Sequence, residues 1–331
     1  MSQMQGEAGL KRILALGACA LAALFGALLV SAPRADAITP IPGRIFILSD
    51  VAGVRGDLFR TTTLNTWKRL TFGLNYPESI SADPNGKFVT LCATKGTSGL
   101  YRIYRISANG GRLKSLIGSA LGCAPTVSPD GRKVAYIQSG TASTKLKVVG
   151  SRGGKSRTIY SFRSSSLYNP IWAGKRIYFD RRVTRNLSAD FEIYSVRASD
   201  GKGLRRHTFS PAGVDYDLKD VLPSGRKILA AVRDPSGAGR HDLVALSPNG
   251  VELRTIMVGD PAASPFGSAA FSPSGIRVAA NEAFPTASDP FLTLISSDIN
   301  NPLIVSQALL NPAISGTSTN DGPYSVDWVK R

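Results

Sequence analysis

The fold of this sequence is decided by the stretch Val127-Ser128-Pro129-Asp130-Gly131-Arg132-Lys133-Val134-Ala135-Tyr136-Ile137. Its Ser-Pro-Asp-Gly segment predicts a tight turn, because proline fixes φ at the start and glycine accepts a positive φ at the end. The Val- and Tyr-rich run that follows has the composition of a β-strand. The stretch therefore predicts the turn and the second strand of a β-hairpin.

Related turns recur along the chain, each with a glycine followed by a strand-like run. The copies are Asp83-Pro84-Asn85-Gly86-Lys87, Trp172-Ala173-Gly174-Lys175-Arg176, Pro223-Ser224-Gly225-Arg226-Lys227 and Ser272-Pro273-Ser274-Gly275-Ile276. The turn glycines lie at intervals of 43 to 51 residues. This period is close to the roughly 40–50 residues of a four-stranded propeller blade.

A second hairpin follows the first in each repeat. Its turns include Asn109-Gly110, Asp200-Gly201 and Asn249-Gly250, which favour the primed two-residue turns of hairpins. Each repeat is thus expected to contain four antiparallel strands. The apolar residue before each first turn is expected to pack between neighbouring blades; these residues are Ala82, Val127, Trp172, Phe271 and Trp328.

The two ends of the chain are expected to share one blade. Arg44-Ile45-Phe46-Ile47-Leu48 has the pattern of a second strand with no first strand before it, and Tyr324-Ser325-Val326-Asp327-Trp328 has the pattern of a first strand with none after it. Pairing these segments leaves no open sheet edge at the seam. The sequence therefore predicts an all-β, six-bladed β-propeller closed by its C-terminal strand.

The N-terminal segment is typical of an export signal. Lys11-Arg12 precedes an apolar run from Ile13 to Val30, and Ala35-Asp36-Ala37 offers a cleavage site after Ala37. The chain would then divide into a signal peptide, 1–37, and a propeller, 38–331. The alternatives are a retained membrane anchor and a lipoprotein processing box at Leu16-Gly17-Ala18-Cys19.

From Gly43 to Arg331 the chain resembles the TolB-like propeller family, whose blades carry an aromatic-Ser-Pro-Asp-Gly-basic turn before a strand. One turn here has Ser-Pro-Asp-Gly in full, the turn at Gly174 is shortened, and Ile276 stands where a basic residue is usual. The resemblance implies the propeller fold. It leaves no room for the N-terminal α/β domain of TolB, so TolB's role in the envelope is not expected here.

The net charge of +17 is the next indication of function. About +16 remains without the signal segment, which would attract polyanions such as acidic lipids or envelope polymers. Solubility alone is the alternative explanation. A nucleic-acid partner is not favoured, because the charge is scattered and no binding motif accompanies it.

Loops between second and third strands are candidates for ligand binding, because rigid sheets hold them at the channel rim. They are expected at Lys95 to Gly99, Ser139 to Thr144, Arg181 to Asp190, Arg233 to Arg240 and Asn281 to Asp289. Two loops concentrate cations, which would bind carboxylate or phosphate groups; these are Arg181, Arg182, Arg185, Arg233 and Arg240. The alternative is that they pair with the local Asp180, Asp190, Asp234 and Asp242.

Catalytic patterns are sparse. The two histidines, His207 and His241, are expected to be surface or hydrogen-bonded residues, and no catalytic residue, metal site or cofactor is predicted. Cys92 and Cys123 are expected to form a disulfide between adjacent blades, with two buried free thiols as the alternative.

Two function classes follow. The first is a monomeric, exported, non-enzymatic scaffold in the periplasm, the envelope or outside the cell, which binds a protein, a peptide or an anionic envelope polymer. Membrane contact is then expected only through an uncleaved N-terminal segment. The second is an enzyme resembling the lyases that act on acidic polysaccharides, although that family's metal-binding histidines have no evident counterparts here.

Overall fold

Short strands joined by tight turns make up the protein, as its Gly- and Pro-rich sequence predicts. The computed structural model describes residues 43–51, 54–63, 66–94, 99–163, 167–185, 188–209, 211, 213–233, 241–258, 267–282, 291–296, 304–309 and 323–330. All of them belong to the unit Pro40–Arg331. Within this described part there is no helix, and therefore none that could span a membrane.

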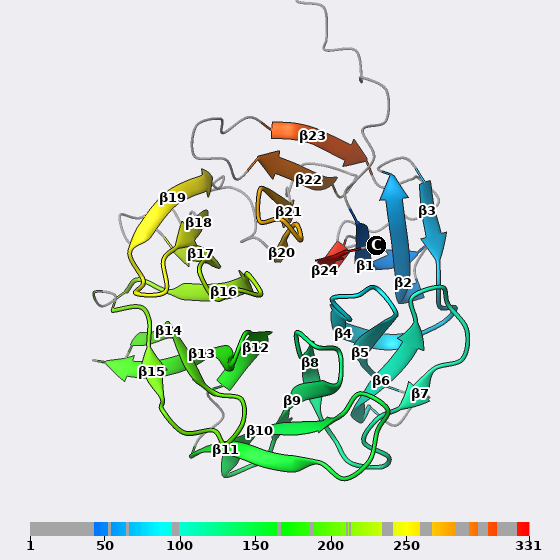
Figure 1. The fold of residues 1–331 in the computed structure, drawn as a ribbon, viewed down its shortest axis with the longest axis horizontal. Coiled ribbons are helices and arrows are strands. Elements are labelled where there is room, and N and C mark those ends of the chain that lie inside the picture. Colours follow the sequence, from blue (N-terminus) through cyan, green and yellow to red (C-terminus); the bar gives the residue numbers. More distant parts are fainter. Residues whose placement is uncertain are drawn as a thin grey trace, which may run out of the picture. The chain divides into compact units, whose positions relative to one another are not determined.

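The strands form four-stranded antiparallel sheets arranged as the blades of a propeller around a central axis (Figure 1). Residues of the innermost strands line cavities along this axis, which we call the channel. From its innermost to its outermost strand, the blade at the seam contains β24 (Pro323–Val329), β1 (Arg44–Val51), β2 (Val54–Thr63) and β3 (Thr66–Arg69). In the same order, the next two blades contain β4 (Asn75–Ala82), β5 (Phe88–Thr94), β6 (Tyr101–Ser107) and β7 (Lys114–Ser115), then β8 (Cys123–Val127), β9 (Lys133–Ser139), β10 (Ser143–Gly150) and β11 (Arg157–Arg163).

The remaining sheets continue the same order. They contain β12 (Leu167–Ala173), β13 (Arg176–Arg185), β14 (Ser188–Arg197) and β15 (Arg205–Arg206), then β16 (Tyr216–Val221), β17 (Ile228–Arg233), β18 (His241–Leu246) and β19 (Glu252–Met257), and finally β20 (Ser268–Phe271), β21 (Arg277–Glu282), β22 (Phe291–Ser296) and β23 (Ile304–Leu309).

The C-terminal strand pairs with the N-terminal blade, as the sequence predicts. β24 runs antiparallel to β1, with Val329 opposite Arg44 and Val326 opposite Ile47. The first strand of this blade therefore comes from the C-terminal part of the chain and its other strands come from the N-terminal part. This pairing covers the edge that β1 would otherwise expose.

Tight turns connect the strands with glycine in the left-handed region. In the founding turn, Gly131 has a φ of 70° and donates its N–H to the carbonyl oxygen of Ser128 at 2.8 Å. Two second-hairpin turns have the same geometry, because Gly110 donates its N–H to Ser107 and Gly250 donates to Ser247, both at 2.9 Å. In the third, Gly201 donates to Arg197, four residues back, at 2.8 Å. The expectation of primed turns at these Asn-Gly and Asp-Gly pairs is wrong, because both primed types need a positive φ at the first central residue and Asn109, Asp200 and Asn249 have none.

The second-hairpin glycines also allow neighbouring blades to approach closely. A Cβ atom at Gly201 would lie 1.7 Å from the carbonyl oxygen of Ile159, and one at Gly250 would lie 1.9 Å from that of His207. Each contact joins a turn to the outer part of the preceding blade. Glycine is therefore required by its spatial neighbour as well as by its own φ.

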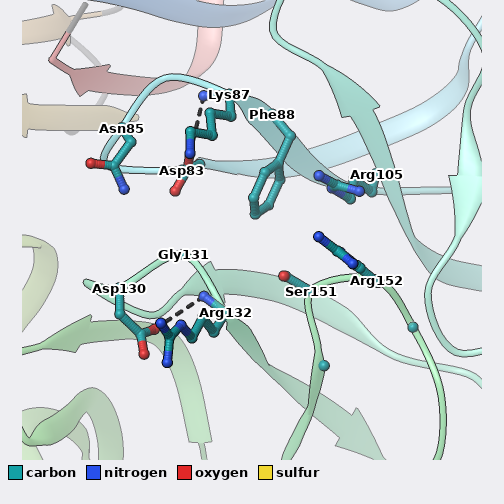
Figure 2. Close-up of a pocket in the computed structure, with 12 residues that line it drawn as sticks. Asp83, Asn85, Lys87, Phe88, Arg105, Asp130, Gly131, Arg132, Ser151 and Arg152 are labelled. Carbon is teal, nitrogen blue, oxygen red and sulfur yellow. Dashed lines mark hydrogen bonds between the residues drawn. The ribbon is translucent and has the colours of Figure 1, made fainter.

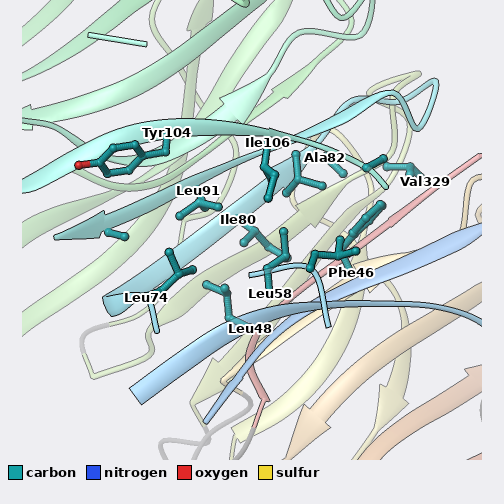
Figure 3. Close-up of a cluster of buried hydrophobic side chains, with 14 residues drawn as sticks. Phe46, Leu48, Leu58, Leu74, Ile80, Ala82, Leu91, Tyr104, Ile106 and Val329 are labelled. Atoms are coloured by element: carbon teal, nitrogen blue, oxygen red, sulfur yellow. The ribbon is translucent and has the colours of Figure 1, made fainter. Parts of the chain in front are cut away.

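Hydrophobic side chains are buried between adjacent blades. Figure 3 shows one such cluster, in which Phe46 and Leu58 of the seam blade pack with Ile80, Ala82 and Leu91 of the next. The pre-turn residues join clusters of this kind, as the sequence predicts; they are Ala82, Val127, Trp172, Phe271 and Trp328. Burial between sheets explains why a chain of this size needs no single large core.

Two of the blades each contain a buried acidic residue that is hydrogen-bonded to an arginine and a threonine of the same blade. Asp57 accepts hydrogen bonds from Thr71 Oγ1 at 2.7 Å and from Arg69 Nε at 2.9 Å. Glu192 accepts from Arg206 at 2.7 Å and also from Thr208. Each carboxylate is almost fully buried, so the arginine and the hydroxyl are needed to offset its lost hydration.

We expect Gly201→Ala to lower the free energy of unfolding by more than about 3 kcal/mol, because left-handed strain of about 1–2 kcal/mol adds to the clash with the Ile159 carbonyl. Urea denaturation measures this change. Gly73→Ala is the matched control, since Gly73 has nearly the same φ, +70° against +72°, and an added Cβ atom there would have no neighbour within 4 Å. Equal losses for the two variants would contradict the close-approach explanation.

Candidate functional site

The innermost strands are held together by hydrogen bonds from backbone to side chain across the channel wall. Ser81 Oγ of β4 accepts the N–H of Val127 in β8 at 3.0 Å. Thr126 Oγ1 of β8 in turn accepts the N–H of Trp172 in β12 at 2.8 Å. Each of these blades thus offers a side-chain acceptor, one residue before its apolar pre-turn position, to the next blade.

Two blades have an apolar residue at this acceptor position, and an aspartate compensates in each case. Ile171 cannot accept a bond from Val221, so Asp220 accepts that N–H on Oδ1 and the N–H of Phe271 on Oδ2, both at 2.7 Å. A carboxyl group can do this because it has two oxygens that accept hydrogen bonds. Asp220 therefore serves its own strand and the next one.

Asp327 has the same double role after Ala270. Its Oδ2 accepts the N–H of Ala82 at 2.6 Å, and the backbone of Trp328 also bonds to its carboxyl group. This contact runs from β24 to β4. The seam is therefore closed by side chains as well as by strand pairing.

Burial makes both carboxyl groups hard to ionise. Burial, with a smaller contribution from the charge of Asp327, raises the pKa of Asp220 to about 8. Burial raises the pKa of Asp327 to about 6. Near neutral pH the channel wall therefore carries one largely protonated carboxyl group and one largely ionised one.

A cavity of about 460 Å³ opens from the channel on the face that carries the first-hairpin turns. Residues from the ends of the innermost strands and from these turns form it, and we call it the channel mouth. Its rim contains Pro84, Pro129, Pro223, Pro273, Trp172, Trp328, Phe271 and Leu222, and Asp220 and Asp327 also line it. Its lining thus combines an apolar rim with polar side chains, which also include Ser81, Asn85, Thr126, Ser224, Ser272, Ser274 and Lys330.

A smaller cavity of about 80 Å³ lies in the same channel. Ser81, Thr126, Ile171, Asp220 and Asp327 line both cavities. The side-chain positions that connect the blades therefore also divide the channel. A molecule bound in either cavity could therefore contact Asp220 and Asp327.

A further polar cluster joins the β12–β15 blade to the β16–β19 blade. Asn169 donates from Nδ2 to Asp180 and to Asp217, at 2.9 Å each, and Asp180 Oδ1 accepts the N–H of Leu218 at 2.9 Å. Burial and the neighbouring Asp217 raise the pKa of Asp180 well above its ordinary value. Lys219 lies 2.6 Å from Asp217 and forms an ion pair with that carboxylate.

The arginines proposed from the sequence lie partly on strands. The expected loop from Arg181 to Asp190 is wrong, because β13 continues to Arg185 and β14 begins at Ser188. Arg181 lies over the Phe162 ring at 4.1 Å and over Tyr194 at 5.0 Å, and Arg182 is exposed. The side chain of Arg185 lies outside the described residues.

The second group of arginines is placed on another blade. Arg233 lies 3.8 Å from Asp215, so its aspartate partner is not one of those expected from the sequence. Arg240 and Asp234 fall outside the described residues, as does the side chain of Asp190.

The two histidines are hydrogen-bonded or half-buried. His207 Nε2 lies 2.7 Å from Ser195 Oγ and Nδ1 lies 2.6 Å from the carbonyl oxygen of Pro248, which connects two blades. Burial lowers the pKa of His207 and thus favours the neutral form of the ring. Burial, followed by the charge of Arg233, also lowers the pKa of His241.

The two cysteines meet where the β4–β7 and β8–β11 blades adjoin. The sulfur atoms of Cys92 and Cys123 are bonded at 1.96 Å, and their Cα atoms lie 5.1 Å apart. Among the described residues, Glu78, Cys92 and Cys123 form a group of side chains of the kinds that bind metal ions, with ligand atoms within 4.8 Å of one another. The two sulfurs of this group are not available as thiolates while the disulfide is formed.

Comparison with known proteins identifies the fold. No family model matches the chain, and no curated protein matches it. Among solved structures, TolB from Acinetobacter baumannii is 18% identical with a TM-score of 0.65, covering 86% of this chain and 67% of that one. The chain has the TolB-like propeller fold. The resemblance expected from the sequence is thereby confirmed at the level of fold.

Other propellers of this fold occur in different settings. The structure of a nidogen/laminin complex matches at 12% identity and a TM-score of 0.60, covering 86% of this chain and 97% of that one. An oligogalacturonate lyase in complex with manganese matches at 15% identity and a TM-score of 0.52, covering 73% of this chain and 68% of that one. At such identities the TolB-like fold is shared and the activity is not inferred from it.

We expect the stability of the protein to fall as the pH rises from about 6 to about 8 because of Asp220; the same loss begins near pH 4, where the unfolded chain ionises, and below about pH 6 Asp327 adds to it. Its folded-state pKa of about 8 lies above that of the unfolded chain, so the folded state binds the extra proton and loses stability as the pH rises through this range. The slope is at most about 1.4 kcal/mol per pH unit. Urea titrations at several pH values measure it.

Asp220→Asn is expected to remove this slope, whatever its effect on stability at a single pH. Asp130→Asn is the control, because Asp130 is exposed and the Ser128 hydroxyl lowers the pKa of its carboxyl group. A slope that persists in Asp220→Asn would show that another group titrates in this range.

Proposed function

We propose that this protein is an exported binding propeller that takes a segment of a partner protein or peptide at the channel mouth. The observation that carries the proposal is the 460 Å³ cavity, which has an apolar rim and hydrogen-bonding groups at its base. Its walls are rigid because hydrogen bonds connect the innermost strands to one another. A preorganised concave site of this kind reduces the entropy lost on binding.

The chemistry of the mouth favours a peptide segment with an apolar side chain. Trp328, Phe271 and the turn prolines supply apolar contact area. Asp220 and Asp327 have carboxyl oxygens beside the cavity that can accept hydrogen bonds from a bound main chain or side chain. An anionic envelope polymer fits this part of the surface less well, because its charge would face the largely ionised carboxyl group of Asp327.

We infer that the propeller has six blades, with the β20–β23 sheet as the sixth. The repeat period of 43 to 51 residues and the pairing of β24 with β1 support this number. A ring of this size places β24 between β20 and β4, as the hydrogen bonds of Val326 to Ser268 and of Ala82 to Asp327 require.

The alternative function, a lyase acting on acidic polysaccharides, can be tested directly. Incubation with polyuronate and added manganese distinguishes turnover from simple binding, and loss of turnover in Arg181→Gln or Arg233→Gln would favour the enzyme. The arginine set Arg181, Arg182, Arg185, Arg233 and Arg240 remains a proposed anion-binding group in that alternative.

We expect a photo-crosslinking amino acid at Ser274 to capture a protein partner from envelope extracts at both low and high salt. Ser274 lines the channel mouth and is exposed. Mass spectrometry identifies the captured chain. The same amino acid at Leu253, which is exposed on the outermost strand β19, is the matched control. Equal capture at both positions, or capture that disappears at high salt, would contradict a shaped site at the mouth.

We further propose export with removal of residues 1–37 and formation of the Cys92–Cys123 disulfide. Intact-mass measurement of the protein isolated without reductant is expected to show a chain that begins at Ile38. Its mass should be lower by two hydrogens than that of the reduced chain. A chain that begins at Met1, or two thiols that react with an alkylating reagent in the native protein, would argue against this proposal.

A further inference from the structure

A second cavity, of about 650 Å³, lies between the β4–β7 and β8–β11 blades. Turns of both blades form it, as Figure 2 shows, and its proximity to the channel mouth follows from Asn85, which lines both cavities. Four cationic and two acidic side chains line it, and we call it the cationic cavity. They are Lys87, Arg105, Arg132, Arg152, Asp83 and Asp130.

Two arginines from different blades face each other in this cavity. Figure 2 shows the side chains of Arg105 and Arg152 pointing toward one another beside the Phe88 ring. The Arg105 guanidinium lies 4.1 Å from the centre of that ring, and its Nε is buried with no hydrogen-bond partner in the described part of the chain. Two like charges held together in this way lower the free energy of a bound anion.

At the junction between the seam blade and the β4–β7 blade, the corresponding arginine is held by hydrogen bonds. Arg60 of β2 holds the position that Arg105 holds in β6, and it donates to the carbonyl oxygen of Ala108 at 2.9 Å and to Asn109 Oδ1 at 2.6 Å. In the next blade the position of Asn109 is occupied by Arg152, whose side chain has no acceptor atom. Arg105 therefore lacks the partner that fixes Arg60.

The charges in the cavity do not cancel. Among the described residues, none of the four cations forms an ion pair. Asp83 is buried and accepts the N–H of Lys87 at 3.0 Å, and Asp130 accepts from Ser128 Oγ at 2.6 Å and from the N–H of Arg132 at 3.0 Å. Four cations and two carboxylates leave two positive charges, which matches a ligand with two negative charges.

We propose that the cationic cavity binds phosphate, either as one phosphomonoester dianion or as two successive phosphodiesters of a polymer. Guanidinium groups bind phosphate oxygens through paired N–H donors, and the site offers such donors from two sides. The volume of the cavity exceeds that of a single phosphate ion and leaves room for the organic part of the ligand. This site adjoins the channel mouth, since Asn85 lines both cavities, but none of its four cationic residues lines the mouth, so either proposal can fail alone.

The test is the substitution Arg152→Asn, which restores the residue found at Asn109 in the neighbouring junction. We expect it to give Arg105 an acceptor, to leave the folding midpoint in urea unchanged or higher, and to weaken phosphate binding at least tenfold. Calorimetry with inorganic phosphate and with synthetic poly(glycerol phosphate), at about 0.15 M salt, measures the binding. Arg226→Asn removes the same charge from an exposed position on the turn of the β16–β19 blade and is the matched control.

The ligands separate the two sources of phosphate. Equal affinity for the ion and for the polymer, both lost in Arg152→Asn, supports a phosphomonoester ligand. Tighter polymer binding with the same loss supports successive phosphodiesters. Equal weakening in Arg226→Asn and Arg152→Asn would show diffuse charge attraction and overturn the proposal. The proposal would also be overturned if the protein bound only phosphatidylglycerol vesicles and Arg152→Asn left that binding unchanged.

Discussion

The structure depends on how the innermost strand of each blade satisfies its backbone. An innermost strand has a partner on one side only, so part of its N–H groups face the channel and the next blade. Ser81, Thr126, Asp220 and Asp327 accept these donors, each from a neighbouring strand. The same side chains narrow the channel, so the requirement that holds the ring together also determines the shape of the channel mouth.

Asp220 and Asp327 replace side-chain hydrogen-bond acceptors that are missing from the preceding blade. Where Ile171 and Ala270 offer no acceptor, the following blade supplies a carboxyl group with two. The cost is a buried ionisable group, which is why the pKa of each is raised. Stability and proton binding are therefore linked at the channel wall.

Much of the fold can be predicted from the sequence, because it depends on local patterns. The Ser-Pro-Asp-Gly turn, the strand runs and the shared seam blade are all expressed within short segments or near the chain ends. The inter-blade role of Gly201 and the meeting of Arg105 with Arg152 depend on residues about forty or more positions apart, and no local pattern indicates them. The charge of Arg181 suggests an exposed loop position, whereas its stem and guanidinium pack on Phe162 and Tyr194.

The shared seam blade also has a consequence for biosynthesis. β1 leaves the ribosome well before its partner β24, which follows only after the strands of the other described blades. Until residues 323–329 emerge, the edge of β1 and the N–H of Ala82 have no native partner. The ring therefore closes late in synthesis, and a premature stop codon upstream of β24 would leave an open, adhesive sheet rather than a slightly shorter propeller.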